Sequence, residues 1–193
     1  YADQFEKVFG KPLEDAWQDW IQWEHAFQES NLAEVARNPI TKHRALSKVG
    51  LGSISRTYYD AKQDRIIAAF RYPGVAAYLG AMSLKDGSLE AFEDVKGPML
   101  FRVTSLAWDP QDRIVYYTTD NNSIRDVVAY DVEKGESHIL FKDARMGDLV
   151  YDPADRSLWG IRHLNGLVTL VRCAFPYTTY SQVLTLPYGE IPY

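Results

Sequence analysis

Two hydrophobic periods divide the chain near Gly50. Before this residue, apolar side chains recur every three or four positions, which is the spacing of one helix face. The clearest run is Leu13, Trp17, Trp20, Ile21 and Phe27. After Gly50 the period becomes two, with short alternating runs that end in turn-forming residues, as in β-strands. The pattern therefore predicts a helical segment over residues 1–50 and β-structure over residues 51–193.

The helical half carries its own boundary signals. Gly10 is placed to end a first helix, and Pro12 suits the first turn of a second one. The "NLAE" sequence that starts at Asn31 has the spacing of a capping box and predicts a short third helix. Asn38 and Pro39 then stop the helical pattern.

One short pattern occurs three times in the β-half. "SLAWDPQDRIVYYTT" covers residues 105–119, "DLVYDPADRSLWGIR" covers 148–162, and a looser copy, "RTYYDAKQDRIIAAFR", begins at residue 56. Each copy predicts a strand, a tight turn and a second strand, because an aspartate caps turn amides and a proline presets the bend. The aspartates that open the three turns, Asp60, Asp109 and Asp152, are spaced 49 and 43 residues apart.

A second hairpin pattern follows each copy, around the turns "KDGS", "EKGE" and "PYTT". The repeating unit is thus four antiparallel strands, with predicted bounds of about 51–98, 99–146 and 147–193. A four-stranded unit at this period is typical of β-propeller blades, which stack face to face because one small sheet cannot bury both faces alone. The fold class that we predict is mainly β: a partial β-propeller of about three blades after an N-terminal helical segment. A β-sandwich is the competing interpretation.

The repeats resemble the blades of TolB-like propellers, which are loosely related to WD repeats. The resemblance lies in "DP..DR" followed by "YDVEKGE", and it extends over residues 51–193. It implies the propeller fold but no particular activity. As a resemblance, it also implies a bacterial periplasmic or other extracytoplasmic setting.

The N-terminal sequence "FEKVFGKPLEDAWQDWIQWEH" is similar to the helices that close gluzincin-type (peptidase MA-like) metallopeptidase domains. Such a peptidase requires H-E-x-x-H on a helix to hold zinc, and this chain has no such motif. No catalytic residue is therefore carried over to this chain. Because the chain begins at Tyr1 and not at a methionine, we interpret it as a piece of a larger bacterial protein whose peptidase-like domain lies upstream.

Composition excludes several classes of function. The net charge is −5 and the 21 basic residues are scattered, whereas nucleic-acid binding needs a concentrated basic face. No apolar stretch approaches the roughly 20 residues that a membrane-spanning helix needs. The four histidines are not at metal-ligand spacing, and no G-x-S-x-G nucleophile motif occurs. We predict no catalytic residue, no metal site and no cofactor.

The candidate ligand-binding residues follow the second strand of the last two blades. They are Arg125, Asp126, Arg162, His163 and Asn165. Loops at this place gather on one face of a propeller near its axis, where ligands bind in such folds. Polar bonding between neighbouring blades is the alternative role for the same residues.

The function that we predict is a non-catalytic binding or scaffolding module with a protein or peptide partner. It would present substrate to the upstream zinc-peptidase-like domain. One alternative is an enzyme with a metal-dependent site on the propeller face, for which only Asp126 and Asn165 are available ligands. A second alternative is a self-assembling structural module, because open blade faces favour pairing into a homo-oligomer.

Overall fold

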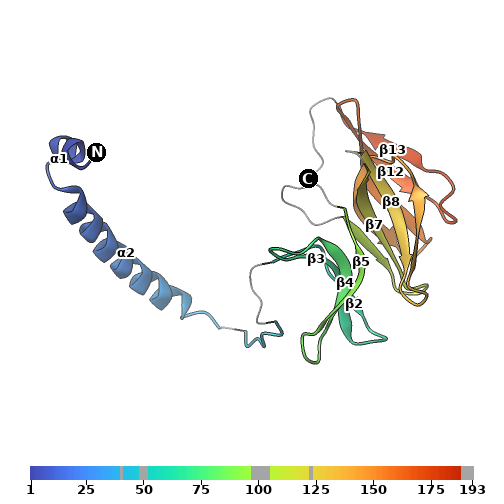
Figure 1. The fold of residues 1–193 in the computed structure, drawn as a ribbon, viewed down its shortest axis with the longest axis horizontal. Helices are drawn as coiled ribbons and strands as arrows, with labels where there is room; N and C mark the ends of the chain where they lie inside the picture. Colours follow the sequence, from blue (N-terminus) through green and yellow to red (C-terminus); the bar gives the residue numbers. More distant parts are fainter. Residues whose placement is uncertain (40, 48–51, 97–104, 122–123, 188–193) are drawn as a thin grey trace. The chain divides into compact units, whose positions relative to one another are not determined.

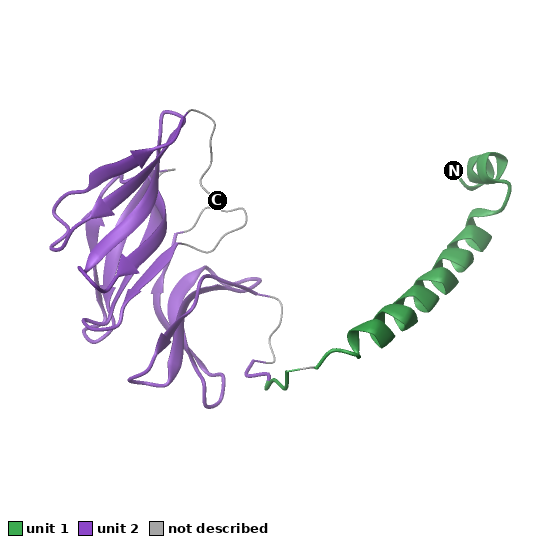
Figure 2. Cartoon of the chain, turned by 180° about the vertical axis from the view of Figure 1, so that it is seen from behind, with its two compact units in different colours: residues 1–44 green, residues 45–193 purple. Residues whose placement is uncertain are grey.

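The chain folds into two compact units in the computed structural model, residues 1–44 and residues 45–193 (Figure 2). The structure describes residues 1–39, 41–47, 52–96, 105–121 and 124–187. The last six residues of the predicted third blade thus lie outside the described part of the chain. Unit 1 is helical and unit 2 is built from strands, which follows the change of hydrophobic period along the sequence.

Unit 1 contains two helices, α1 (Ala2–Phe9) and α2 (Leu13–Val35). Gly10 ends α1 in the left-handed conformation, with φ of 75°, and its N–H donates to the carbonyl oxygen of Glu6 at 2.8 Å. The prediction of a separate third helix at Asn31 is wrong, because α2 continues through this residue to Val35. Helix propagation adds one backbone hydrogen bond per residue, so a capping signal inside an established helix does not interrupt it.

Unit 2 contains three antiparallel sheets, which Figure 1 shows in chain order from cyan to red. The first sheet is formed by β1 (Ser53–Ile54), β2 (Tyr58–Asp60), β3 (Arg65–Arg71), β4 (Tyr78–Ser83) and β5 (Leu89–Asp94). The second is formed by β6 (Leu106–Asp109), β7 (Ile114–Asn121), β8 (Ile124–Asp131) and β9 (Glu136–Phe141). The third is formed by β10 (Met146–Asp152), β11 (Ser157–Leu164), β12 (Leu167–Cys173) and β13 (Ser181–Thr185).

Each sheet is a four-stranded meander in which every strand pairs with the next along the chain. We call the three sheets blade 1, blade 2 and blade 3. Blade 1 carries one addition, since the two-residue strand β1 pairs with β3 beside β2. The predicted architecture, mainly β with three four-stranded antiparallel blades after a helical segment, is confirmed.

Alternating side chains of blade 2 pack against both neighbouring blades. Trp108 and Tyr117 belong to a core cluster shared with Leu79 of blade 1. Their sequence neighbours Ala107 and Tyr116 belong to a second cluster, which is shared with blade 3. Because successive strand residues point to opposite faces, the two-residue period of the sequence places one set on each side of the middle blade.

Among the described residues, no helix is both long enough and apolar enough to cross a bilayer.

Candidate ligand site between the first two blades

The three repeat aspartates occupy the same place in each blade, at the end of the first strand of the main meander. Asp60 ends β2, Asp109 ends β6 and Asp152 ends β10, and each carboxylate accepts a hydrogen bond from the backbone N–H two residues later. The bond closes the tight turn to the next strand, which is the local role expected of an aspartate before a turn.

Asp60 also receives an arginine from the neighbouring blade. Arg113 of blade 2 donates to both carboxylate oxygens of Asp60, from Nη1 at 2.5 Å and from Nη2 at 2.8 Å. Arg65 of blade 1 donates to Oδ2 from its Nε at 3.0 Å. Asp60 is 2% exposed and Arg113 is 6% exposed, so this bidentate pair lies inside the contact between the two blades.

The charges around this pair compensate one another. The guanidinium of Arg113 also forms an ion pair with Glu133, which in turn pairs with Lys62 at 2.7 Å. Hydrogen bonding from Arg113 lowers the pKa of Asp60 to about 2, against the opposing effect of burial and with further help from Arg65. The same pair raises the pKa of Arg113 above its ordinary value. Both groups therefore keep fixed charges near neutral pH.

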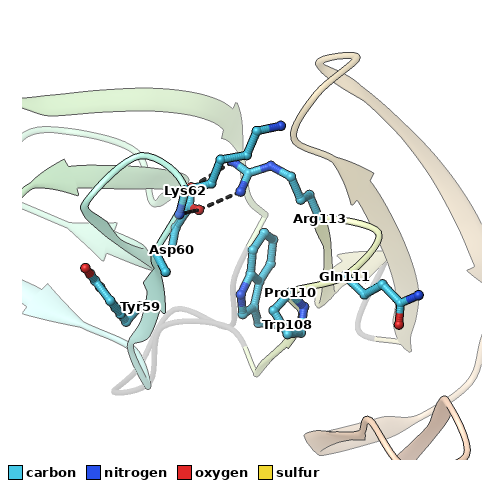
Figure 3. Close-up of a pocket in the computed structure, with 8 residues that line it drawn as sticks. Tyr59, Asp60, Lys62, Trp108, Pro110, Gln111 and Arg113 are labelled. Atoms are coloured by element: carbon cyan, nitrogen blue, oxygen red, sulfur yellow. Dashed lines mark hydrogen bonds and ion pairs between the residues drawn. The ribbon is translucent and has the colours of Figure 1, made fainter.

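A cavity of about 240 Å³ opens at this contact, and Figure 3 shows the side chains that line it. We call it the inter-blade cleft. It is lined from blade 1 by Tyr59, Asp60, Ala61 and Lys62, and from blade 2 by Trp108, Pro110, Gln111 and Arg113. Figure 3 shows the Asp60 carboxylate and the Arg113 guanidinium pointing toward each other, with Trp108 on one side of Asp60 and Tyr59 on the other.

The aromatic walls of the cleft differ in exposure. Tyr59 is 57% exposed, and its hydroxyl donates to Asp64 at 3.0 Å. Trp108 is only 6% exposed, and its Nε1–H has no hydrogen-bond partner within the part of the chain that the structure describes. The Arg113 guanidinium lies over the Trp108 ring, 5.7 Å from its centroid. The cleft thus combines an exposed ring, a buried ring and a donor without an acceptor.

At the corresponding contact between blades 2 and 3, the arginine has different partners. Arg156 reaches back to Asp112, while its Nη2 remains 4.0 Å from Asp109. Phe175 lies against Arg156, at 4.1 Å from ring centroid to guanidinium carbon, and the Tyr177 hydroxyl donates to the Arg156 carbonyl at 2.8 Å. Both aromatic residues come from the longer β12–β13 connection, whereas the β8–β9 turn over residues 132–135 contains no aromatic residue.

Four of the five sequence-predicted ligand residues meet at the connection between blades 2 and 3. The backbone of Arg145 bonds to both segments: its N–H donates to the Arg125 carbonyl, and its carbonyl accepts from the His163 N–H. The Asp126 carboxylate accepts from the Asp143 N–H at 2.7 Å, and Arg162 donates to the Ala144 carbonyl at 3.3 Å.

Asn165, the fifth predicted residue, lies exposed in the β11–β12 turn with φ of 51°. Asp126 is 3% exposed, in contrast. Ligand binding by the five residues stays a prediction, and the observed contacts of Arg125, Asp126, Arg162 and His163 hold a connecting segment in place. Within the described residues, no three His, Cys, Asp or Glu side chains come together in a way that could hold a metal ion.

The inter-blade cleft was missed by sequence reasoning, although the signal was present. An aromatic residue precedes the turn aspartate in every copy: Tyr59, Trp108 and Tyr151. All three turns contain four residues, but the aspartate–arginine pair comes one position later in blade 1, so Asp64 (φ 48°) takes the left-handed position that Arg113 (58°) and Arg156 (60°) occupy. Matching the arginines by sequence therefore conceals which of them reaches across a blade contact.

Comparison with known proteins supports the architecture alone. No family model matches the chain, and neither does any curated protein. Among solved structures, TolB from Acinetobacter baumannii is similar with a TM-score of 0.56 and 13% identity, covering 67% of this chain and 32% of that one. The three sheets of this chain are thus β-propeller blades. A chain of the nidogen–laminin complex is similar with a TM-score of 0.53 and 13% identity, covering 68% of this chain and 48% of that one.

The β-propeller domain of the trilobed protease from Pyrococcus furiosus gives a TM-score of 0.52 at 9% identity, covering 74% of this chain and 46% of that domain's chain. The chain therefore spans less than half the length of these three structures. Identities this low show a shared fold and do not transfer an activity.

Proposed function

We propose that this chain is a non-catalytic binding module, and that its ligand site is the inter-blade cleft. The likeness to β-propellers supports a binding or scaffolding role at most. The observation that carries the proposal is the cleft itself, whose lining includes the exposed Tyr59 and the buried Trp108 beside mutually paired charges.

The electrostatics of the cleft favour recognition over acid–base chemistry. A general acid or base works best when its pKa lies near the working pH. The pKa of Asp60 is about 2 and that of Arg113 is raised above its already high ordinary value, so neither exchanges a proton near neutral pH. Hydrogen bonds and ion pairs also hold both side chains in place, so they line the cleft in a fixed position.

The partner class that we propose is a protein or peptide, in an extracytoplasmic setting. The narrower hypothesis is that the module presents substrate to a zinc-peptidase-like domain of a larger protein. It rests on the sequence resemblance of residues 5–25. Self-assembly and a metal-dependent enzyme site remain the alternatives that the sequence raised, and no contact of the described residues favours either.

Photo-crosslinking tests the proposed function. A benzophenone amino acid at Gln111, on the cleft wall, is compared with the same probe at Ile139, a distant exposed position. In an extract of the source organism, we expect Gln111 to yield crosslinked peptides from one protein that Ile139 does not yield. Identical products at both positions, or none at Gln111, would overturn the proposal.

A further inference from the structure

Helix α2 presents four exposed aromatic side chains that the function proposed above does not use. They are Trp17, Trp20, Trp23 and Phe27, and we call them the aromatic face of α2. We propose that this face docks in a groove of a partner protein, with an apolar floor and a rim of lysine or arginine side chains. Such docking involves unit 1 alone and does not depend on the inter-blade cleft.

The first feature that leads to this partner is the exposure of the aromatic face. The exposed fractions of its side chains lie between 48% and 59%, and α2 has no buried residue. At about 100° per residue, the four side chains fall within about 120° of the helix circumference. Trp17 and Trp20 lie 4.9 Å apart between ring centroids, and Trp23 stacks on Phe27 at 5.4 Å. A band of rings in contact with water costs free energy, and its burial by a partner is favoured.

The second feature is the spacing of the apolar side chains along α2. Leu13, Trp17 and Trp20 stand at positions i, i+4 and i+7. Trp20 and Phe27 form a further i, i+7 pair, which spans two helical turns. An amphipathic helix enters an apolar groove of another protein with anchors at these intervals. Because α2 runs without interruption from Leu13 to Val35, the anchors belong to one element (Figure 1).

The third feature is the charge of α2, which selects the kind of groove. The helix contains neither lysine nor arginine, and it carries six carboxylates: Glu14, Asp15, Asp19, Glu24, Glu29 and Glu34. Lys11 pairs with Asp19, and Arg37 pairs with Glu34. No ion pair among the described residues neutralises the other four carboxylates. A groove with a basic rim therefore complements both the aromatic face and the charge around it.

The same charge disfavours two other ways of covering the aromatic face. A second copy of α2 would bring six more carboxylates to the contact, and like charges repel one another. A membrane surface is disfavoured as well, because helices that lie in the bilayer interface carry lysine and arginine on their polar face. Anionic lipids attract such basic residues, and α2 has none.

The test is a fluorescence titration of the intact 193-residue chain with the acetylated peptide amide LKKLLKLLKKLLKL. As a helix, this peptide presents an apolar face bordered by lysines, which is the chemistry of the proposed groove. Three of the five tryptophans belong to the aromatic face, whereas Trp108 is already buried at 6% exposure. We expect the emission to shift to shorter wavelength as the indoles leave water.

Two conditions separate charge complementarity from non-specific adhesion. The glutamate peptide LEELLELLEELLEL has the same apolar face with carboxylates at its border, and it should produce no shift. Raising the salt concentration from about 0.1 M to about 1 M shortens the Debye length from about 10 Å to about 3 Å, so it should weaken binding of the lysine peptide.

Two pairs of matched variants locate the binding. Trp20→Ala should weaken binding of the lysine peptide by about tenfold, as loss of an anchoring tryptophan does. Gln22→Ala, on the opposite side of α2, should leave the affinity unchanged. Glu24→Lys places a positive charge among the aromatic rings, and it should weaken binding more than Glu29→Lys on the far side of the helix. Alanine is the best helix former, so circular dichroism should show an intact helix in Trp20→Ala.

Photo-crosslinking then examines the natural partner. A benzophenone amino acid at Trp20, compared with the same probe at Gln22, should attach to apolar segments that contain lysine or arginine. Attachment to acidic segments, or to α2 of another copy of this chain, would overturn the inference.

The titration can overturn it in four ways. These are no shift with the lysine peptide, equal shifts with both peptides, equal affinities within each matched pair, or tighter binding to phosphatidylcholine vesicles than to the lysine peptide. Vesicle binding would assign the aromatic face to a membrane surface. None of these outcomes bears on the inter-blade cleft, which the Gln111 crosslinks test separately.

Discussion

Asp60 and Asp152 hold the same position in two blades, but they have different neighbours. Asp60 accepts bonds from Arg65 and Arg113 and is 2% exposed. Asp152 is half-buried, and its Oδ1 accepts from the Ala154 N–H at 2.9 Å. The energetic importance of the repeat aspartate should therefore depend on whether an arginine from the next blade reaches it.

A pair of matched substitutions tests this difference. We expect Asp60→Asn to lower the free energy of unfolding by about 3 kcal/mol, because it leaves the buried Arg113 guanidinium without its carboxylate. Asp152→Asn should cost less than about 1 kcal/mol, since an amide oxygen can still accept the turn N–H. Urea denaturation followed by circular dichroism measures both values. Equal losses in the two variants would contradict this interpretation.

Stability against acid should show the same ion pair. The pKa of Asp60 is lowered to about 2 from 3.8, so its stabilising contribution is complete above about pH 4 and disappears as the pH falls towards 2. The wild type should lose on the order of 2 kcal/mol through Asp60 in this window. Asp60→Asn lacks the titrating group, so its stability should fall less steeply. Parallel curves for the two proteins from pH 5 to 2 would show that Asp60 does not contribute.

At the scale of a single strand, a position can require glycine because a neighbouring backbone lies too close for any side chain. In blade 1 the register shifts between Leu79 and Gly80, where a β-bulge brings β5 close to β4. A Cβ at Gly80 would lie 2.4 Å from the carbonyl oxygen of Glu90 on β5. The bulge thus depends on glycine because of the close approach of a neighbouring backbone.

Gly80→Ala should lower the free energy of unfolding by about 2–3 kcal/mol, because the two strands must separate to admit the methyl group. Gly135→Ala is the control: its φ of 70° strains a side chain, but the nearest atom to its Cβ is 3.8 Å away, so a loss of about 1 kcal/mol is expected. Hydrogen exchange should show faster β5 amides in Gly80→Ala alone. Unchanged β5 protection in that variant would refute the steric explanation.

At the scale of the whole molecule, the three blades depend on one another, and the helices belong to a different compact unit. Blade 2 contributes to the core clusters of both blade contacts, so its two faces are buried only when both neighbours are in place. Helices α1 and α2 have no buried residue and belong to the other compact unit. Folding of the blades should therefore be cooperative and independent of residues 1–44.

Removal of residues 1–44 tests this division. We expect the remaining chain, residues 45–193, to unfold in one transition, with a midpoint within a few degrees of the intact chain. It should keep the amide signals of the blade residues. Thermal denaturation and NMR spectra of the two chains provide the comparison. A shortened chain that is unfolded, or one that shows two separate transitions, would contradict it.

Much of the architecture could be predicted from the sequence, because the controlling interactions are local. Alternation around Leu106 and Trp108 predicts a strand with two packed faces, and an aspartate before a turn predicts the bend after Asp109. The four-strand period then predicts stacked blades. The predicted helix start at Asn31 was wrong because this local capping signal competes with the cooperativity of a long helix, and α2 continues through Asn31.

The candidate site could not be predicted in the same way, because it depends on contacts between residues far apart in the chain. The sequence by itself determined the repeat, its strands and the aromatic–aspartate pair at each turn. Only the tertiary structure decided that Arg113 crosses to Asp60, 53 residues away, while Asp64 takes the equivalent place in the first turn. It also decided that aromatic side chains contact Arg156 at one blade contact, whereas a cleft beside Trp108 opens at the other. Side-chain reach across stacked sheets depends on how neighbouring blades are spaced and oriented, which leaves no periodic trace in the sequence.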